Sequence, residues 1–531
     1  MSAGKFSLKR LVRNLPVSME TLALLGPKPR ARTRRYNLSY LRKILPDACD
    51  QIRPYANAAQ PGKRVLIFST LHYWIRHSTI LGLALVGLGY KVTLVYLPLP
   101  DWRRRFNRFE NMRHSISTQS TLEPARALME FVNLFNVQPE KELPPQLGNA
   151  VDSVSIHDTQ YTFESEEVKL ESNFYRLRRE SNNRAACALL AWLRSNPVDV
   201  ALIPNGANVE FGAAFRTARY LDIPTVTYEF SEDRGQIWLA QNEEVVRQNT
   251  DPLWQARGQL PLTARQRQEI EDLESARRGA RTFGMSDRLW QDVPAGSIGQ
   301  TRAALGLNNR PVILLATNVI GDSLTLERSI FSSSMSEWIT RTVQYFAKHT
   351  DVQLVIRIHP GERYSKGFSA IEVVNKVEKQ LPENIHVVGP LEKVNTYDVM
   401  KLTTLGLVYT TTTGLEMAMD GIPVVVAGET HYRKRGFTFD PNTWSEYFET
   451  LDSLLANPAR YRLKGEQINT AWNYAYRFFF EFPRPFPWRV VQFWKDYEVW
   501  PMARVFSDEG QAQFGNTFRY LAGEPLDWSR I

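Results

Sequence analysis

The sequence contains very little cysteine, and this limits the chemistry that it can carry. Cys49 and Cys187 are its two cysteines among 531 residues. That number is too small for a disulfide framework or a cysteine-ligated metal cluster, and it fits a reducing compartment. No apolar segment with a cleavage site follows the basic N-terminus, so the sequence shows no secretory signal.

Long uninterrupted apolar runs are also missing. The longest apolar stretch, residues 79–100, contains Lys91 and nearby glycines. It is more typical of a helix, a turn and a strand than of a membrane span. We therefore expect a cytoplasmic protein.

Several cofactor motifs are absent. The segment after the first expected strand, "STLHYWIRHS" (69–78), has no glycine, which argues against a dinucleotide fingerprint and an NAD enzyme. There is no P-loop. No Asp-x-Asp pair follows an apolar strand in the manner that holds a divalent ion against a diphosphate. We expect no cofactor and no metal.

The sequence does contain two series of alternating strands and helices. Its composition, 43% hydrophobic and 23% charged, is ordinary for a globular protein, and its length allows two or three domains. We predict an α/β protein with two Rossmann-like, doubly wound domains facing a cleft. The strands are expected at 63–70, 91–99, 198–204 and 224–230, and then at 311–317, 352–358, 385–388, 404–410 and 422–427.

The expected domain division follows from where this alternation starts and stops. It comprises a basic extension (1–60), an N-terminal acceptor domain (61–285) with an insertion (101–170), a C-terminal donor domain (286–460) and a helical tail (461–531). The tail is rich in aromatic residues over 471–500. We favour helices that strap the domains together over a surface for a membrane or partner.

Positive charge is concentrated at the N-terminus. Met1–Lys43 holds eleven basic residues and one acid, so nearly all of the net charge of +9 resides there. In "KFSLKRLVRNL" (5–15) apolar residues are roughly helix-spaced among the cations, which suits an anionic membrane surface. A solvated tail, or an arm packed on the body, is the alternative. No nucleic-acid-binding motif accompanies the charge, so no nucleic acid is expected.

The stretch "TTTTGLEMAMDGIPVVVAG" (410–428) combines hydroxyls, a glycine and a carboxylate between two apolar strands. Thr410–Thr413 can cap a helix that ends at Gly421. Hydroxyls and free N–H groups at a helix start can hold a phosphate, and Glu416 can accept hydrogen bonds from a ribose. The alternative is a capped helix with nothing bound.

A second stretch, "VQLVIRIHPGERYSKG" (352–367), places Arg357, His359 and Glu362 at the end of a buried strand. Ligands of open α/β sheets bind outside the carboxyl ends of strands. A cation and an imidazole there suit an anionic leaving group. A turn residue is the alternative for His359, and the Arg357 side chain can also point into the protein because strand residues alternate faces.

Together these two motifs resemble a known family. "IRIHPGE" (356–362) followed by residues 410–432 is similar to the C-terminal half of bacterial GT-B glycosyltransferases, and most similar to the capsule and surface polysaccharide biosynthesis group. The resemblance covers about 300–460. It is looser over 60–240, where it rests on "GLGYKV" (87–92), "IPNGAN" (203–208) and "IPTVTYEF" (223–230).

The resemblance implies a glycosyltransferase that uses a nucleotide-sugar donor and a surface polysaccharide or lipid-linked glycan acceptor, with the basic leader holding it at the inner membrane face. It implies that His359 and Arg357 contact the donor phosphate, that the threonine run and its glycine hold phosphate, and that Glu416 binds ribose or sugar. The donor-binding set is Arg357, His359, Glu362, Thr411, Thr412, Thr413, Gly414 and Glu416.

The acceptor side is expected in the N-terminal half. An inverting transfer needs a base to deprotonate the acceptor hydroxyl, and the candidates are His77, Glu229, His72 and Asp233. A retaining enzyme needs no such base. Alternative functions are a CDP-polyol phosphotransferase, a sugar-nucleotide epimerase, or a non-catalytic binding protein on the same fold.

Overall fold

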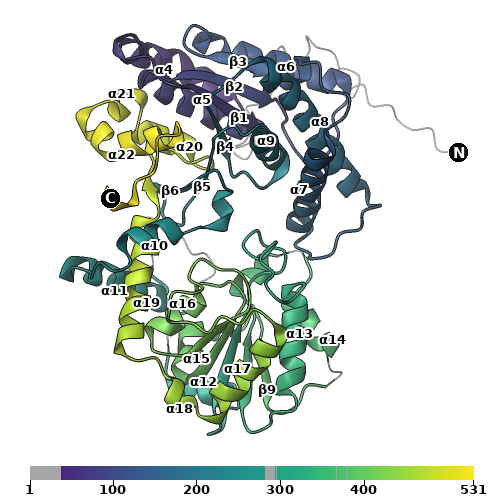
Figure 1. Ribbon diagram of the computed structural model, residues 1–531, viewed down its shortest axis with the longest axis vertical. Helices are drawn as coiled ribbons and strands as arrows, with labels where there is room; N and C mark the ends of the chain where they lie inside the picture. Colours follow the sequence, from purple (N-terminus) through teal and green to yellow (C-terminus); the bar gives the residue numbers. More distant parts are fainter. Residues whose placement is uncertain (1–36, 282–292, 295, 366, 378–379, 531) are drawn as a thin grey trace, which may run out of the picture.

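The computed structural model describes residues 37–281, 293–294, 296–365, 367–377 and 380–530 (Figure 1). Most of the basic leader, residues 1–36, therefore lies outside the described residues. In the described part, no helix is both long and apolar enough to cross a membrane. The described residues form two α/β halves, each built on one sheet.

The N-terminal half contains a seven-stranded sheet in the order β12-β6-β5-β4-β1-β2-β3. Its centre is parallel and buried on both faces, which explains apolar runs such as "VLIF" in β1. At one edge β6 and β12 run antiparallel. The strands are β1 (Arg64–Thr70), β2 (Lys91–Leu97), β3 (Glu130–Asn133), β4 (Val200–Pro204), β5 (Thr225–Phe230), β6 (Gln236–Gln241) and β12 (Arg484–Pro485).

One segment that we expected as an insertion within this domain, and one that we expected to precede it, contribute to its sheet and core. The region 101–170, expected as an insertion, includes β3, which pairs in parallel with β2 and completes the sheet edge. The expected extension includes α4, whose Leu41, Leu45 and Ile52 enter the same core as β1. The helices are α4 (Ser39–Ala58), α5 (His72–Gly87), α6 (Arg108–Leu122), α7 (Pro145–Phe163), α8 (Asn173–Ser195) and α9 (Val209–Tyr220).

A buried charge cluster joins three of these helices at the carboxyl end of the sheet. Arg178 of α8 donates to Asp158 of α7 (3.1 Å) and to Glu210 of α9 (2.9 Å), and the three side chains are each about 1% exposed. Asn182 donates to the same Asp158 carboxylate at 2.9 Å. Hydrogen bonds and opposite charges thus compensate the burial of these groups.

The C-terminal half has a five-stranded parallel sheet in the order β11-β10-β7-β8-β9. All five of its expected strands are present, with ends within two residues of the expected ones. They are β7 (Val312–Ala316), β8 (Gln353–Arg357), β9 (Ile385–Val388), β10 (Thr403–Val408) and β11 (Val424–Val426). The helices of this half are α12 (Ile298–Ala304), α13 (Met335–Phe346), α14 (Ala370–Val377), α15 (Thr396–Leu402), α16 (Thr413–Met419), α17 (Trp444–Ala456) and α18 (Pro458–Tyr461).

The chain passes between the halves twice. Leu253 of α10 (Asp251–Arg257) and Ile270 and Leu273 of α11 (Ala264–Arg278) pack in the C-terminal core, so the first crossing precedes the expected boundary at 285. The tail then returns: α19 (Gly465–Tyr476) lies on the C-terminal half (Figure 1), and β12 pairs with β6 in the N-terminal sheet. It ends in α20 (Phe493–Val499), α21 (Met502–Val505) and α22 (Asp508–Leu521), packed on the N-terminal core. The tail therefore straps the halves together.

Candidate functional site

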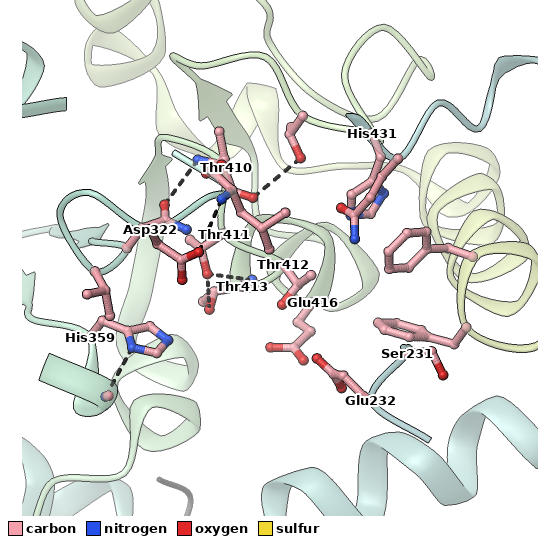
Figure 2. A pocket seen from close by; sticks show the side chains of 18 of the residues that line it. Ser231, Glu232, Asp322, His359, Thr410, Thr411, Thr412, Thr413, Glu416 and His431 are labelled. Carbon is pink, nitrogen blue, oxygen red and sulfur yellow. Dashed lines mark hydrogen bonds between the residues drawn. The ribbon is translucent and has the colours of Figure 1, made fainter. Parts of the chain in front are cut away.

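A cavity of about 530 Å³ is lined by residues of both halves. The C-terminal half contributes the segments that follow β7, β8 and β10, where the two sequence motifs lie (Figure 2). The other walls are the segment after β5, including Ser231, Glu232 and Asp233, and the returning tail with Phe478, Phe479 and Phe480. This position, at the carboxyl ends of parallel strands, is where α/β folds bind ligands.

The threonine run forms one wall of the cavity. Thr410 is tied down, since its hydroxyl donates to the Leu324 carbonyl (2.9 Å) and its N–H to Asn318 (3.2 Å). Thr411, Thr412 and Thr413 line the cavity. Thr412 stands at the N-cap of α16, but its side chain makes no capping bond. The run therefore presents hydroxyls to the cavity at the start of α16.

Gly414 is explained by packing. A Cβ at this position would lie 2.4 Å from the hydroxyl of Tyr432 and 2.9 Å from a methyl of Val408. The same Tyr432 hydroxyl donates to the carbonyl of Thr411 at 2.6 Å, which fixes the threonine loop. Gly414 is not among the residues that line the cavity.

Glu416 lies at the other side of the threonine run and is 3% exposed. Its Oε1 accepts hydrogen bonds from Arg277 (3.1 Å) and from the hydroxyl of Tyr397 (3.2 Å). Arg277 comes from α11, also donates to Glu232 (3.3 Å), and lies over the ring of Phe479 at 4.0 Å. Both of these bonds to Glu416 end on Oε1.

His359 reaches the cavity from the end of β8. The backbone N–H of His359 donates to the Thr317 hydroxyl at 3.0 Å. The ring Nδ1 accepts the N–H of Gly361 at 3.0 Å. Because Nδ1 acts as an acceptor, the proton of a neutral ring is assigned to Nε2. The ring lines the cavity on the same side as the end of β8.

The other two members of the expected donor set have different roles. Arg357 donates to the carbonyl of Gly389 at 2.6 Å and lines a separate cavity of about 420 Å³. Burial lowers its pKa to about 10. Glu362 accepts from the hydroxyl of Ser369 (2.6 Å) and the N–H of Ala370 (3.2 Å), at the start of α14. Neither side chain lines the main cavity.

The two candidate histidines of the N-terminal half are not at the cavity either. His77 is fully buried; its Nε2 lies 3.2 Å from the Trp488 carbonyl and its Nδ1 3.2 Å from the Tyr228 hydroxyl. His72 is 9% exposed and its ring lies 5.2 Å from that of His114. Sequence proximity to the end of β1 suggested a cleft position, but the returning tail covers His77.

The environment of His77 predicts an effect on stability. Burial lowers its pKa to about 3, from an ordinary 6.5. Between these values the unfolded chain binds a proton on this ring and the folded protein does not, so the free energy of unfolding falls as the pH is lowered. From pH 7 to pH 5 this ring should remove about 2 kcal/mol.

The measurement is urea unfolding at pH 7 and at pH 5. In His77→Gln the component due to this ring is absent, so the difference between the two pH values should be smaller by about that amount. For each protein, the free energy of unfolding at pH 7 is the reference for its value at pH 5. The comparison therefore separates the pH effect from any general loss of stability in the variant. An unchanged difference in the variant would contradict the assignment.

The candidate carboxylates occupy different positions. Glu229, in β5, accepts from Asn205 (2.9 Å) and from the N–H of Phe230 (2.9 Å), and burial raises its pKa. It is not among the lining residues, whereas Asp233, three residues after β5, is. Glu229 is thus a half-buried carboxylate near the end of β5, and Asp233 is the one that lines the cavity.

Sequence reasoning missed several lining residues. Asp322 follows β7, accepts from the N–H of Leu324 at 3.1 Å, and has a pKa raised by burial. The rule that ligands bind after strand ends could have identified it. Nothing in the local sequence marks Glu164, which joins the cavity from the end of α7, or His431, whose ring stacks on Phe478 at 3.7 Å.

The lining contains six carboxylates and three arginines, so it offers few cations to an anion. Arg277 is paired with Glu416 and Glu232, and Arg328 donates to the carbonyls of Val246 and Arg247. The other polar groups that line the cavity include the threonine hydroxyls and the imidazole of His359. In the part of the chain that the structure describes, no three His, Cys, Asp or Glu side chains are grouped to hold a metal; metal independence stays a prediction.

Comparison with protein families gives one match. Residues 280–458 match the family described as "Capsule polysaccharide biosynthesis protein". The matched segment, about a third of the chain, contains both motifs of the cavity, and the resemblance noted in the sequence is confirmed there. The match supports a role in surface polysaccharide synthesis.

The other comparisons are more distant. No curated protein matches the chain. The KpsC β-Kdo 2,4 transferase of Thermosulfurimonas dismutans is 14% identical over 55% of this chain and 83% of its own, with a TM-score of 0.36. A UDP-GlcNAc 2-epimerase of Neisseria meningitidis is 13% identical over 79% and 100%, with a TM-score of 0.25. These TM-scores are low, so the assignment of two Rossmann-like halves rests on the strand order itself.

Proposed function

We propose that this protein is a glycosyltransferase that moves a sugar from a nucleotide-sugar donor to a surface polysaccharide or lipid-linked glycan. The observation that carries the proposal is the cavity between the two Rossmann-like halves. His359, Thr411–Thr413 and Glu416, which lie in two separate motifs of the matched segment, all line it.

Each of these residues has a role that its geometry supports. The hydroxyls of Thr411–Thr413 and the Nε2–H of His359 would stabilise the phosphate of the leaving nucleotide as negative charge develops on it. Glu416 would bind ribose hydroxyls through Oε2, because Oε1 is held by Arg277 and Tyr397.

For an inverting transfer, we assign the acceptor base to Asp322. It lines the cavity, and burial raises its pKa, which makes the carboxylate a better proton acceptor near neutral pH. Asp233 is the second candidate, since it lines the cavity and Glu229 does not. The fully buried His77 takes no part in this mechanism. We further propose that the enzyme works in the cytoplasm at the membrane face where lipid-linked acceptors are exposed.

The proposal is tested by calorimetric titration with UDP, GDP, CMP and CDP. We expect one nucleotide to bind with micromolar affinity and His359→Ala to weaken that binding at least tenfold, the loss expected for a charge-assisted hydrogen bond. His386→Ala is the matched control, because this histidine is in β9 and does not line the cavity. It should bind like the wild type.

The outcome also separates related activities. Conversion of the donor sugar without any acceptor would indicate an epimerase. Transfer of a polyol phosphate from a CDP donor would indicate a phosphotransferase. If none of the four nucleotides binds the wild-type protein, the proposed donor site is wrong and a non-catalytic binding function replaces it.

A further inference from the structure

Helix α6 exposes an apolar stripe. Phe109, Met112 and Ile116 are 62%, 43% and 47% exposed. Their spacing of three and then four residues places them on one face of the helix. Surface helices of soluble proteins normally turn such a stripe towards the core.

The opposite face of α6 is unusually polar for a buried surface. Ser115, Thr118 and Thr121 are buried against the body of the protein. Thr121 accepts a hydrogen bond from Arg42 of α4 at 3.2 Å, and the buried hydroxyl of Thr118 has no partner among the described residues. Leu122 is the apolar residue on the buried face, so this face carries three hydroxyl side chains and one leucine, while three large apolar side chains are exposed on the other face. Folding of the monomer alone does not explain that arrangement.

Arginines surround the stripe. Residues 101–116 contain five arginines and two acids. Arg103, Arg104 and Arg105 precede the helix, and the first two lie over the rings of Trp102 (5.0 Å) and Phe106 (4.1 Å). One of the two acids, Glu110, is used in the capping box of α6 with Asn107. Arg104 pairs with Glu110 and Arg105 with Glu180. The five arginines still outnumber the neighbouring acids, so the surface next to the stripe is cationic and aromatic.

This surface continues towards the cavity. The ring of Trp102 lies 6.1 Å from that of Phe174, which lies 5.0 Å from that of Phe163. Phe163 is 51% exposed and ends α7, and the next residue, Glu164, lines the cavity. Figure 1 shows α6 at the outer end of the N-terminal half and α7 running from that end towards the C-terminal half.

We propose that this surface docks the protein on an anionic phospholipid bilayer. We define the α6 surface as Phe109, Met112 and Ile116 with Arg103, Arg104, Arg105 and Arg108. Apolar side chains flanked by arginines match the boundary between acyl chains and anionic headgroups. Docking on the bilayer does not require the proposed function. The role that we give to docking does rest on the proposed function: a lipid-linked acceptor would reach the cavity along the rings of Trp102, Phe174 and Phe163.

The charge of the undescribed N-terminus supports the same partner. Residues 1–36 contain nine basic residues and one acid. They join the described chain at Asn37, directly before α4, the helix whose Arg42 contacts α6. Residues 1–36 are therefore linked in sequence to the helix that contacts α6, and both cationic segments would add to attraction by an anionic surface.

The first test is flotation of the full chain with phosphatidylcholine vesicles, with and without about a third of phosphatidylglycerol, a composition chosen to give a strongly anionic surface. We expect binding to the anionic vesicles and at least a tenfold loss in the triple variant Phe109→Ser, Met112→Ser, Ile116→Ser. The matched control carries Leu260→Ser, Val491→Ser and Val499→Ser, three side chains that are 47–55% exposed elsewhere. It should bind like the wild type.

A second measurement locates the contact. Ile116→Cys can be labelled with a polarity-sensitive dye because both natural cysteines are buried. Its emission should shift to the blue on addition of anionic vesicles, and that of a label at Val499→Cys should not. Nucleotide titration of the triple variant, made without lipid, reports on the donor site separately, so failure of one proposal is not mistaken for failure of the other.

Three outcomes would overturn the proposal. Wild-type binding by the triple variant would assign membrane attachment to the basic leader alone. If the wild type is a dimer that does not bind vesicles, and the triple variant is a monomer, the α6 surface contacts a second copy of the chain. Equal binding to neutral and anionic vesicles would remove the role of the arginines.

Discussion

Replacing Glu416 by alanine is expected to reduce nucleotide affinity, and kcat/KM for the donor, by about a hundredfold. Hydrogen bonds from ligand hydroxyls to a carboxylate contribute about 1.5–3 kcal/mol each, and a loss near 3 kcal/mol corresponds to that factor. The variant also removes the Oε1 atom that holds Arg277 and Tyr397 in place. The variant would therefore lose both the carboxylate that accepts ligand hydrogen bonds and the contacts that position Arg277 and Tyr397.

Two controls make this result specific. Glu416→Gln keeps the shape and one acceptor oxygen, so its loss should be smaller than that of the alanine variant. Glu429→Gln changes another carboxylate of the same cavity, one that is 54% exposed, and should alter affinity only a few-fold. Calorimetry with the nucleotide that binds the wild type measures all three. Unchanged affinity in Glu416→Ala would remove Glu416 from the donor site.

The second large effect is on stability. Arg178→Met should lower the free energy of unfolding by about 3–5 kcal/mol, because it leaves the Asp158 and Glu210 carboxylates buried without their cation. The three helices that meet at this cluster would lose their shared contact. Denaturant unfolding followed by circular dichroism measures the change.

The neighbouring residue provides the control. Arg179 is on the same helix and pairs with Asp152 at 2.7 Å, but its side chain is 54% exposed. Arg179→Met should therefore cost less than about 1 kcal/mol. If the two variants lose similar stability, water reaches the Arg178 cluster and its charges are not isolated.

The sequence predicted the strands well because both sheets are buried on two faces. Runs such as residues 312–316 and 404–408 are apolar and β-branched, and these features mark a parallel strand without knowledge of its partners. The sequence did not predict β3, because this strand has only four residues and is flanked by prolines and loops. Only its pairing with β2 in the folded protein identifies it. The tail helices were expected, but not that β12 extends the N-terminal sheet.

Candidate residues could be placed near a strand end but not oriented. His359 and Glu416 reach the cavity, whereas Arg357 and Glu362, in the same motif as His359, satisfy local backbone groups. Which way such a side chain turns depends on unpaired carbonyls and N–H groups that only the folded chain brings close. The same reason explains why Glu164 and the tail phenylalanines escaped notice: they come from distant segments.

The path of the tail has a consequence for how the protein is made. The core of the N-terminal half includes Leu41 and Ile67 from the start of the chain, and also Trp488 and Phe518 from near its end. The C-terminal core, in contrast, is drawn from residues between 253 and 528, most of them before 483. During synthesis on the ribosome, the half that emerges first must wait for the last segments before its core can close. The half that is translated first therefore cannot complete its core until nearly the whole chain has been made.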